Sequence, residues 1–158
     1  MLGLESDPEV KIKELGLVLP QPPKPVASYI PTLVISNLLF TSGTLPLKEG
    51  KVIYTGKMGE KNNSIEVGYE ASKLATLNSL SAVKEALGSL LKIKRVIKVA
   101  GFVNSMPGFT DQPKVINGAS DLLVNIFGEA GKHVRSAVGV AELPLNALVE
   151  IEFVYQLE

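Results

Sequence analysis

The sequence predicts an α+β sandwich in which a mixed β-sheet carries two helices packed on one of its faces. Two observations lead to this fold class. Apolar runs with strand-like alternation are interrupted by two longer segments with helical periodicity, giving the order strand, strand, strand, helix, strand, helix, strand, strand. The chain also has 158 residues, of which 46% are hydrophobic, and this suits one domain with a sizeable core.

The N-terminal part, residues 1–24, is expected to be an appendage of a main domain that spans residues 25–158. Asp7 followed by Pro8 is typical of a helix start, so a short helix is predicted over 8–14, ending at Gly16. The prolines at positions 20, 22, 23 and 25 fix an extended backbone and remove amide donors. They predict a strap that lies on the surface of the main domain.

The first half of the main domain is expected to contain three strands and a long helix. The runs LVIS and LLFTS on either side of Asn37 predict a hairpin, and KVIYTG predicts a shorter third strand. Asn63, with Glu66 three positions later, resembles a capping box that opens a helix running to about Leu87 and stopping at Gly88. The charged residues of this helix share one narrow sector, so the rest of its surface is expected to be covered by a sheet.

The second half is expected to add a strand over 95–103, a helix that starts near Asp111 and Pro113 and ends at Gly128 or Gly131, and strands over 136–141 and 148–157. In the last strand the apolar residues share one face and Glu150 lies on the other, whereas both faces of the preceding strand are small or apolar. One helical layer covers only one side of a sheet. Self-association is therefore expected to cover the other side.

Composition argues against several classes of function. Sixteen basic residues balance sixteen acidic ones, so charge does not favour nucleic acid or an anionic membrane as a partner. The chain has no cysteine and one histidine, which excludes thiolate chemistry and a histidine metal cluster, and its glycines form no phosphate loop. No membrane span and no secretory leader are recognised, so a cytoplasmic location is expected.

Two charged residues, Arg135 and Glu150, are set into otherwise small and apolar runs near the C-terminus. A buried guanidinium needs a partner, and its planar fork fits either a side-chain carboxylate or an acidic ligand. If residues 143–147 formed a hairpin turn, about six residues, or roughly 20 Å, would separate the two along the strand axis. They should then meet only between chains. An internal or intersubunit salt bridge remains the alternative.

Three further residues each have both a functional and a structural interpretation. His133 precedes Arg135 by two positions and either lines a ligand cleft or belongs to the loop at the strand's start. Ser42 has no identifiable general base beside it, so a hydrogen-bonding role is preferred to that of a nucleophile. Tyr29 either lines a ligand site or packs near the proline strap.

The segments HVRSAVGVAELP and VEIE resemble the Rid family, also called the YjgF family, whose members carry a similar R-S-x-V-x-V-A-x-L-P stretch and a V-E-I-E strand. The runs FTSGTLP, VASY and FVNSMPGF also fall where that family has equivalents. The resemblance covers about residues 25–157. The chain differs from the family pattern at His133, where proline is common, at Ala27 to Tyr29, which replace G-P-Y, and in a longer loop over 106–113.

The resemblance implies a chorismate-mutase-like fold assembled as a homotrimer, with ligand clefts between subunits and no metal or cofactor. It implies hydrolysis of reactive enamines and imines, such as 2-aminoacrylate, to 2-keto acids and ammonia. In that family the arginine matching Arg135 binds the substrate carboxylate, and the glutamate matching Glu150 activates water or shuttles a proton. Residues matching Tyr29, Ser42 and the backbone of Gly43 line the cleft, and Asn117 is a looser match.

Two other functions are compatible with the same segments. One is a non-enzymatic module in which Arg135 captures the carboxylate of a small metabolite. The other is an endoribonuclease acting on single-stranded RNA, because some relatives are described in that way. Low aromatic content and zero net charge weigh against the second.

Overall fold

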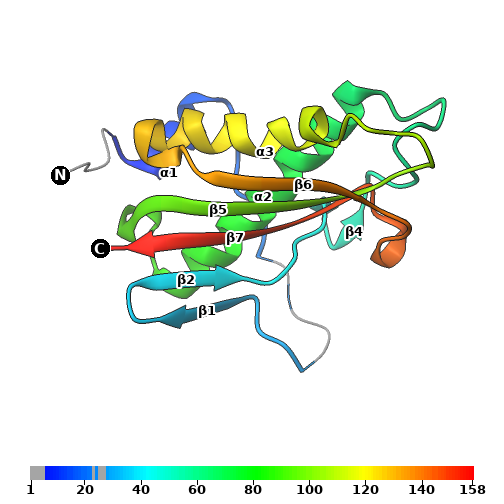
Figure 1. Ribbon diagram of the computed structural model, residues 1–158. Coiled ribbons are helices and arrows are strands. Elements are labelled where there is room, and N and C mark those ends of the chain that lie inside the picture. The colour runs from blue at the N-terminus through cyan, green and yellow to red at the C-terminus, as the bar shows by residue number, and fades with distance from the viewer. Residues whose placement is uncertain (1–5, 23, 25–27) are drawn as a thin grey trace.

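A five-stranded mixed sheet forms the centre of the molecule (Figure 1). The computed structural model describes residues 6–22, 24 and 28–158. The strands lie in the order β1-β2-β7-β5-β6, where β5–β6 is the parallel pair and the other neighbours are antiparallel. Their bounds are Thr32–Ile35 for β1, Leu38–Thr41 for β2, Ile93–Asn104 for β5, Val134–Val140 for β6 and Val149–Leu157 for β7. The predicted mixed sheet is confirmed.

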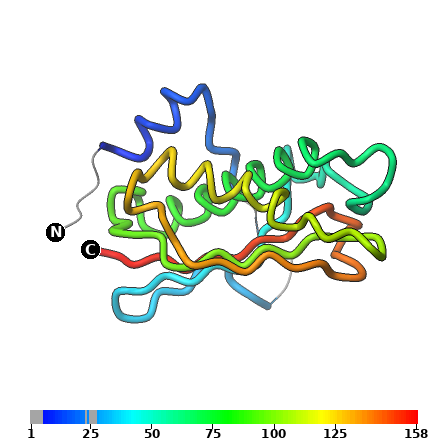
Figure 2. Tube along the Cα trace, turned by 45° about the horizontal axis from the view of Figure 1, so that its top comes forward, coloured from blue at the N-terminus to red at the C-terminus, as the bar shows by residue number. Residues whose placement is uncertain are grey.

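Two long helices cover one face of this sheet, as predicted (Figure 2). They are α2, Ile65–Leu87, and α3, Gln112–Phe127. Apolar side chains from both helices pack on the sheet, and the largest fully buried ones include Leu80, Leu123, Phe153 and Tyr155. Burial of this continuous apolar surface is the main source of stability for the two layers.

The N-terminus of α2 begins one residue later than the sequence suggests. Ser64 is the N-cap, and its Oγ accepts a hydrogen bond from the Val67 amide at 3.3 Å. Asn63 is not the cap, because its side-chain amide donates to the carbonyl oxygens of Thr55 and Lys57 instead. Gly88 ends the helix as expected, with a φ of 82° that favours glycine.

The predicted third strand, KVIYTG, does not join the main sheet. Only Lys51–Val52 is extended there (β4), and it pairs with Leu47–Lys48 (β3) in a separate two-stranded ribbon. This ribbon packs beside α2, because Asn78 on that helix donates to the Leu47 carbonyl oxygen at 2.8 Å.

The N-terminal helix α1, Pro8–Glu14, has the predicted bounds, and the Asp7 side chain caps it. Ile12 is 2% exposed and belongs to the hydrophobic core, while Glu9 pairs with Lys84 on α2. Farther along, Ser81 donates to the Pro20 carbonyl oxygen and ties the following segment to α2. Pro23, Pro25 and Ala27 of the expected strap and VASY segment lie outside the described residues.

The β6–β7 connection corrects the expected hairpin over residues 143–147. β6 pairs with β5 in parallel and β7 lies on the other side of β5, so β6 and β7 are not neighbours. The cause is the crossover through α3, which returns the chain beside the strand it left, as β-α-β units do. Short 3-10 turns lie at Leu90–Lys92, Gly128–Gly131 and Pro144–Asn146, the last of them in this connection.

The face of the sheet away from α2 and α3 carries exposed apolar side chains. Phe40 is 39% exposed and Val138 is 45% exposed, and Phe102 and Val154 beside them are only partly buried. A search of the described helices finds none with the length and apolar character needed to cross a bilayer.

Candidate functional site

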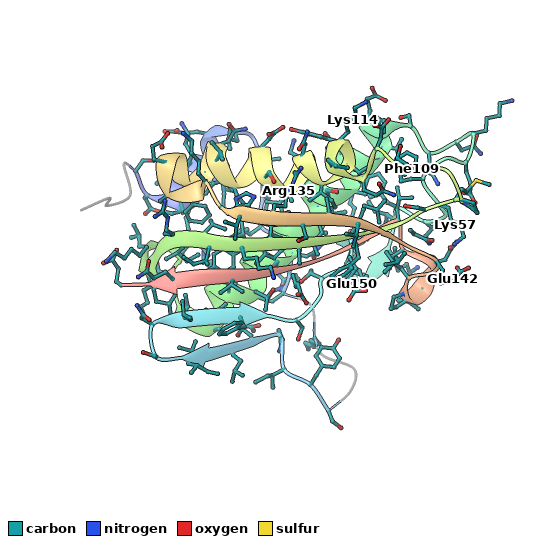
Figure 3. The ribbon with its side chains drawn as sticks, viewed as in Figure 1. Lys57, Phe109, Lys114, Arg135, Glu142 and Glu150 are labelled. Carbon is teal, nitrogen blue, oxygen red and sulfur yellow. The ribbon has the colours of Figure 1, made fainter. Side chains whose placement is uncertain are left out.

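Arg135 projects from the edge strand β6 towards α3. Its pairing partner in β5 is Val99, a core residue, and this register directs both side chains to the helix side of the sheet. The Nη1 atom donates to Asn117 Oδ1 at 2.8 Å and to Ser120 Oγ at 3.1 Å, two groups that lie one helical turn apart on α3. Figure 3 shows Arg135 at this junction of β6 and α3. Both groups that hold the guanidinium are therefore neutral.

No carboxylate of the described residues forms an ion pair with Arg135. Both of its hydrogen bonds come from Nη1, and Nη2 and Nε donate to no group of the described residues. A half-buried guanidinium oriented in this way retains its positive charge for a planar acidic ligand, which it can bind through two parallel hydrogen bonds.

His133 supports this arrangement through Ser120. The His133 Nδ1 atom lies 2.6 Å from the Gly131 carbonyl oxygen, which can only accept, so Nδ1 carries the proton of the neutral ring. The Nε2 atom lies 2.9 Å from Ser120 Oγ and accepts its hydroxyl proton. Burial lowers the pKa of His133, and the charge of Arg135 lowers it further, against the opposing effect of the Gly131 hydrogen bond.

Ser120 is a site residue that the sequence did not reveal. The available signal was its spacing, because a residue three positions after Asn117 on a helix shares the same face. The first group of site residues, here called the arginine group, thus contains Arg135, Asn117, Ser120 and His133.

Glu150 lies on the opposite face of the sheet. It alternates along β7 with Val149 and Ile151, which are fully buried beneath the helices. Burial raises the pKa of Glu150, and repulsion from Glu152 raises it further. Within the described part of the chain, no hydrogen bond or ion pair holds its carboxylate. A carboxyl group whose pKa is raised in this way holds its proton to higher pH than a free one, which suits a group that accepts and donates a proton.

Gly43 provides the space in which the Glu150 carboxylate lies. A Cβ atom added at Gly43 would be 2.0 Å from Glu150 Oε1 and 2.8 Å from its Cδ. The neighbouring Ser42 donates from Oγ to the Ile30 carbonyl oxygen at 2.7 Å, and its amide donates to the Pro31 carbonyl oxygen at 2.8 Å. These bonds join the end of β2 to the segment that carries Tyr29, whose side chain is 50% exposed. The second group, the glutamate group, contains Glu150, Gly43, Ser42 and Tyr29.

The two groups do not meet within one chain. Arg135 is aligned through Val99 with Phe153, which is three residues from Glu150 on β7. Two strand spacings and three residues correspond to roughly 14 Å between Cα atoms, and the two side chains leave the sheet on opposite faces. The distance of about six residues expected from a hairpin was wrong, because β5 lies between the two strands. The expected separation of the two residues within one chain nevertheless holds.

A further polar cluster lies at the end of the sheet, near Lys57 and Glu142 in Figure 3. Lys57 Nζ donates to Asn104 Oδ1 at 2.8 Å and to the Ala141 carbonyl oxygen, and lies 3.1 Å from Glu142 Oε2. Lys57 therefore forms an ion pair with Glu142 and donates hydrogen bonds to Asn104 and Ala141. We interpret it as a structural link between these loops.

Comparison with known proteins identifies the family. The family model described as "YjgF/chorismate_mutase-like, putative endoribonuclease" matches residues 9–157. The chain belongs to the YjgF family. The resemblance read from the segments around Arg135 and Glu150 is thereby confirmed, and so is the coarse α+β fold that it implies.

Three proteins similar to this chain illustrate the relationship. The crystal structure of Atu1372 from Agrobacterium tumefaciens, a protein of unknown function, is 45% identical, covers 96% of this chain and 92% of its own, and has a TM-score of 0.89. Protein TCP17 of Trypanosoma cruzi is 40% identical over 92% of this chain and 91% of its own length. A protein of Dermatophagoides farinae named 2-iminobutanoate/2-iminopropanoate deaminase is 31% identical over 88% of this chain and 93% of its own.

Proposed function

We propose that this protein hydrolyses small, reactive enamines and imines that carry a carboxylate, releasing 2-keto acids and ammonia. The observation that carries the proposal is the orientation of Arg135, which two neutral side chains hold by one nitrogen while no described carboxylate pairs with it. The 2-iminobutanoate/2-iminopropanoate deaminase name of a relative 31% identical supports the same reaction class.

The proposed site is completed by a second copy of the chain. The arginine group and the glutamate group lie on opposite faces of one sheet, so a single ligand can contact both only where two chains meet. The exposed apolar face that includes Phe40 and Val138 supports such an association, because monomers seldom leave large contiguous apolar surfaces in water. The family resemblance implies a homotrimer with one cleft at each interface, and we adopt that assembly in the proposal.

The chemistry assigns one role to each group. Arg135 binds the substrate carboxylate and thereby places the C=N carbon of the imine beside the Glu150 of the neighbouring chain. Glu150 takes a proton from water as the oxygen bonds to that carbon, and the proton passes to the imine nitrogen. Collapse of the carbinolamine forms the C=O bond and releases ammonia, with Glu150 again transferring the proton. An enamine enters this sequence after protonation at carbon.

The direct test measures keto-acid release from an imino acid generated in solution, above the spontaneous rate. Wild-type protein is expected to accelerate it, whereas Arg135→Ala and Glu150→Gln are expected to lose about 100-fold or more in kcat/KM with the oligomer intact. Matched controls are Arg95→Ala, the other arginine of the chain, and Glu129→Gln, which is exposed near the end of α3. Unchanged turnover by Arg135→Ala contradicts the proposal.

The same experiment separates the two alternatives. Calorimetric binding of pyruvate that depends on Arg135, without accelerated imine hydrolysis, would identify a binding module. Cleavage of unstructured RNA that survives Arg135→Ala would identify a ribonuclease.

A further inference from the structure

A large groove lies beside the glutamate group, on the side of the molecule where the N-terminal segment crosses α2. Its volume is about 1050 Å³, and its walls come from α2, from residues 17, 18, 20–22 and 24, and from the chain between Ser42 and Tyr54. Ligand pockets for molecules of drug size commonly have volumes of roughly 300 to 1000 Å³. The groove is thus large enough for a small molecule or for part of one.

The walls of the groove are mainly apolar. The residues that line it include Leu17, Pro20, Leu45, Leu47, Leu74 and Leu77. Five charged residues also line the groove, three basic and two acidic: Lys24, Lys48, Lys73, Glu49 and Glu70. Lys73 lies 3.9 Å from the carboxylate of Glu70, which offsets its charge. Apolar walls of this kind favour a hydrocarbon or aromatic substituent over a charged one.

Hydrogen bonds from α2 fix two opposite walls. Ser81 Oγ donates to the Pro20 carbonyl oxygen of the N-terminal segment, and Asn78 Nδ2 donates to the Leu47 carbonyl oxygen of the β3–β4 ribbon. Both polar side chains are buried on the helix. The groove is therefore formed before a ligand arrives, which reduces the ordering that binding requires.

Gly43 connects the groove to the glutamate group. Gly43, Ser42 and Tyr29 line the groove, and the position of a Cβ atom on Gly43 coincides with the Glu150 carboxylate. Gly43 is therefore in contact both with the groove and with the Glu150 carboxylate, which carries the proposed proton transfer.

We infer that the groove receives the side chain of the substrate, and that the preferred substrates are imino and 2-oxo acids with a branched or aromatic apolar side chain. This inference rests on the proposed function, which places the acid carboxylate at Arg135 of one chain and the reacting carbon at Glu150 of the next. The substituent on that carbon then extends past Gly43 into the groove. Each methylene buried in such a pocket changes kcat/KM by about tenfold or more.

The first arm of the test compares ligands on the intact wild-type protein. Imino acids generated in solution from alanine, leucine and phenylalanine serve as substrates, and pyruvate and 4-methyl-2-oxopentanoate serve as binding probes in calorimetry. The leucine-derived imine is expected to have a kcat/KM about tenfold or more above that of the alanine-derived one, and 4-methyl-2-oxopentanoate is expected to bind correspondingly more tightly than pyruvate.

The second arm narrows the groove near Gly43. Leu45→Trp, two positions from Gly43, is expected to lower the ratio of leucine-derived to alanine-derived kcat/KM by about tenfold. Leu91→Trp is the matched control, because Leu91 is 49% exposed and does not line the groove. Leu45→Ala, which widens the groove, is expected to shift preference towards the phenylalanine-derived imine and supplies a second variant if tryptophan prevents folding.

The outcomes distinguish this inference from the proposed function. The inference is overturned if small and bulky ligands have equal kcat/KM and equal affinity. It is also overturned if the ratio of leucine-derived to alanine-derived kcat/KM is the same in Leu45→Trp and Leu91→Trp. Both outcomes leave imine hydrolysis in place. Selective binding of 4-methyl-2-oxopentanoate without turnover of any imine supports the groove and contradicts the hydrolytic function. Absence of both binding and turnover contradicts both.

Discussion

Arg135 and Glu150 lie on opposite faces of one sheet, three residues apart in register and separated by the width of β5. In the proposed function this relationship is decisive, because Arg135 on the helix side of the sheet would bind the substrate carboxylate and Glu150 on the open side would transfer the proton.

Gly43 is expected to be required for the position of Glu150. In Gly43→Ala the new methyl group would lie 2.0 Å from Oε1, so the carboxylate must move away. A displacement of about 1 Å at a reacting group can cost on the order of 100-fold in rate, and a fall of that size in kcat/KM is expected. Thermal unfolding should change little, since the atoms in conflict are the end of a flexible side chain. Full activity in this variant would show that Glu150 is not placed by Gly43.

The pH dependence should report the raised pKa of Glu150. The rising limb of kcat/KM is expected above the ordinary carboxyl value of 4.5, and Glu152→Gln should move it to lower pH by removing a repelling charge. The folded state binds this proton more tightly than the unfolded chain, so its contribution to the free energy of unfolding falls as pH rises from 4.5 through the folded pKa. Glu150→Gln should abolish that slope. Glu129→Gln is the control and should leave the rising limb at its wild-type pH. If Glu152→Gln also leaves the limb unchanged, the limb belongs to a residue other than Glu150.

Ser120 is expected to affect ligand binding more than catalysis. Ser120→Ala removes one of the two acceptors that hold Arg135 and also the hydrogen-bond partner of His133. Loss of one such hydrogen bond corresponds to about 1 kcal/mol, so KM for a carboxylate substrate should rise about fivefold with a smaller change in kcat. Ser136→Ala, next to Arg135 on the opposite face, is the control. A fall in kcat with unchanged KM would contradict this role.

His133 should contribute to stability in a defined pH range. Its pKa is lowered from 6.5, chiefly by burial, so the unfolded chain takes up this proton first as pH falls. The free energy of unfolding is therefore expected to decrease as pH drops below 6.5 towards the folded pKa, and His133→Gln should reduce that decrease. Chemical denaturation at a series of pH values measures this change in the free energy of unfolding. Identical slopes in both proteins would contradict the assignment.

The close contact of α2 and α3 depends on Gly118. A Cβ atom there would lie 2.0 Å from the Tyr69 carbonyl oxygen, which belongs to the backbone and cannot move independently. Gly118→Ala is expected to lower the free energy of unfolding by about 1 to 3 kcal/mol. Asn125→Ala, exposed on the same helix, should change it by less than about 0.5 kcal/mol. Denaturant titration compares the two, and equal stabilities would contradict the packing argument.

Local sequence signals predicted the elements well. The Asp7-Pro8 start, the hairpin around Asn37 and the stop at Gly88 depend on neighbouring residues, and each occurs as expected. The prediction of Asn63 as the cap was wrong because its side-chain amide donates to the carbonyl oxygens of Thr55 and Lys57 in the preceding loop. The spacing of Asn63 and Glu66 does not encode the path of that loop. KVIYTG has the composition of a strand, yet only two of its residues pair, and they pair outside the main sheet.

The sequence points to most residues of the candidate site, but it does not give their arrangement. Arg135 and Glu150 stand out as charges in apolar runs, and strand alternation correctly assigns Glu150 to the open face. The position of Arg135 beside α3 follows from the parallel pairing of β6 with β5, which the assumed hairpin had excluded. Ser120 is an ordinary helix residue in the sequence. It becomes part of the site only because the crossover places α3 over the edge strand.

The central claim is that Arg135 and Glu150 act together across two chains, and mixing two inactive variants tests it most directly. Arg135→Ala and Glu150→Gln are unfolded and refolded together in equal amounts, with each variant treated alone as a control. In a trimer assembled at random, about one interface in four combines an intact arginine from one chain with an intact glutamate from the next. The account predicts that about a quarter of wild-type imine hydrolysis returns on mixing. Mixed oligomers that form but remain as inactive as the separate variants would contradict it.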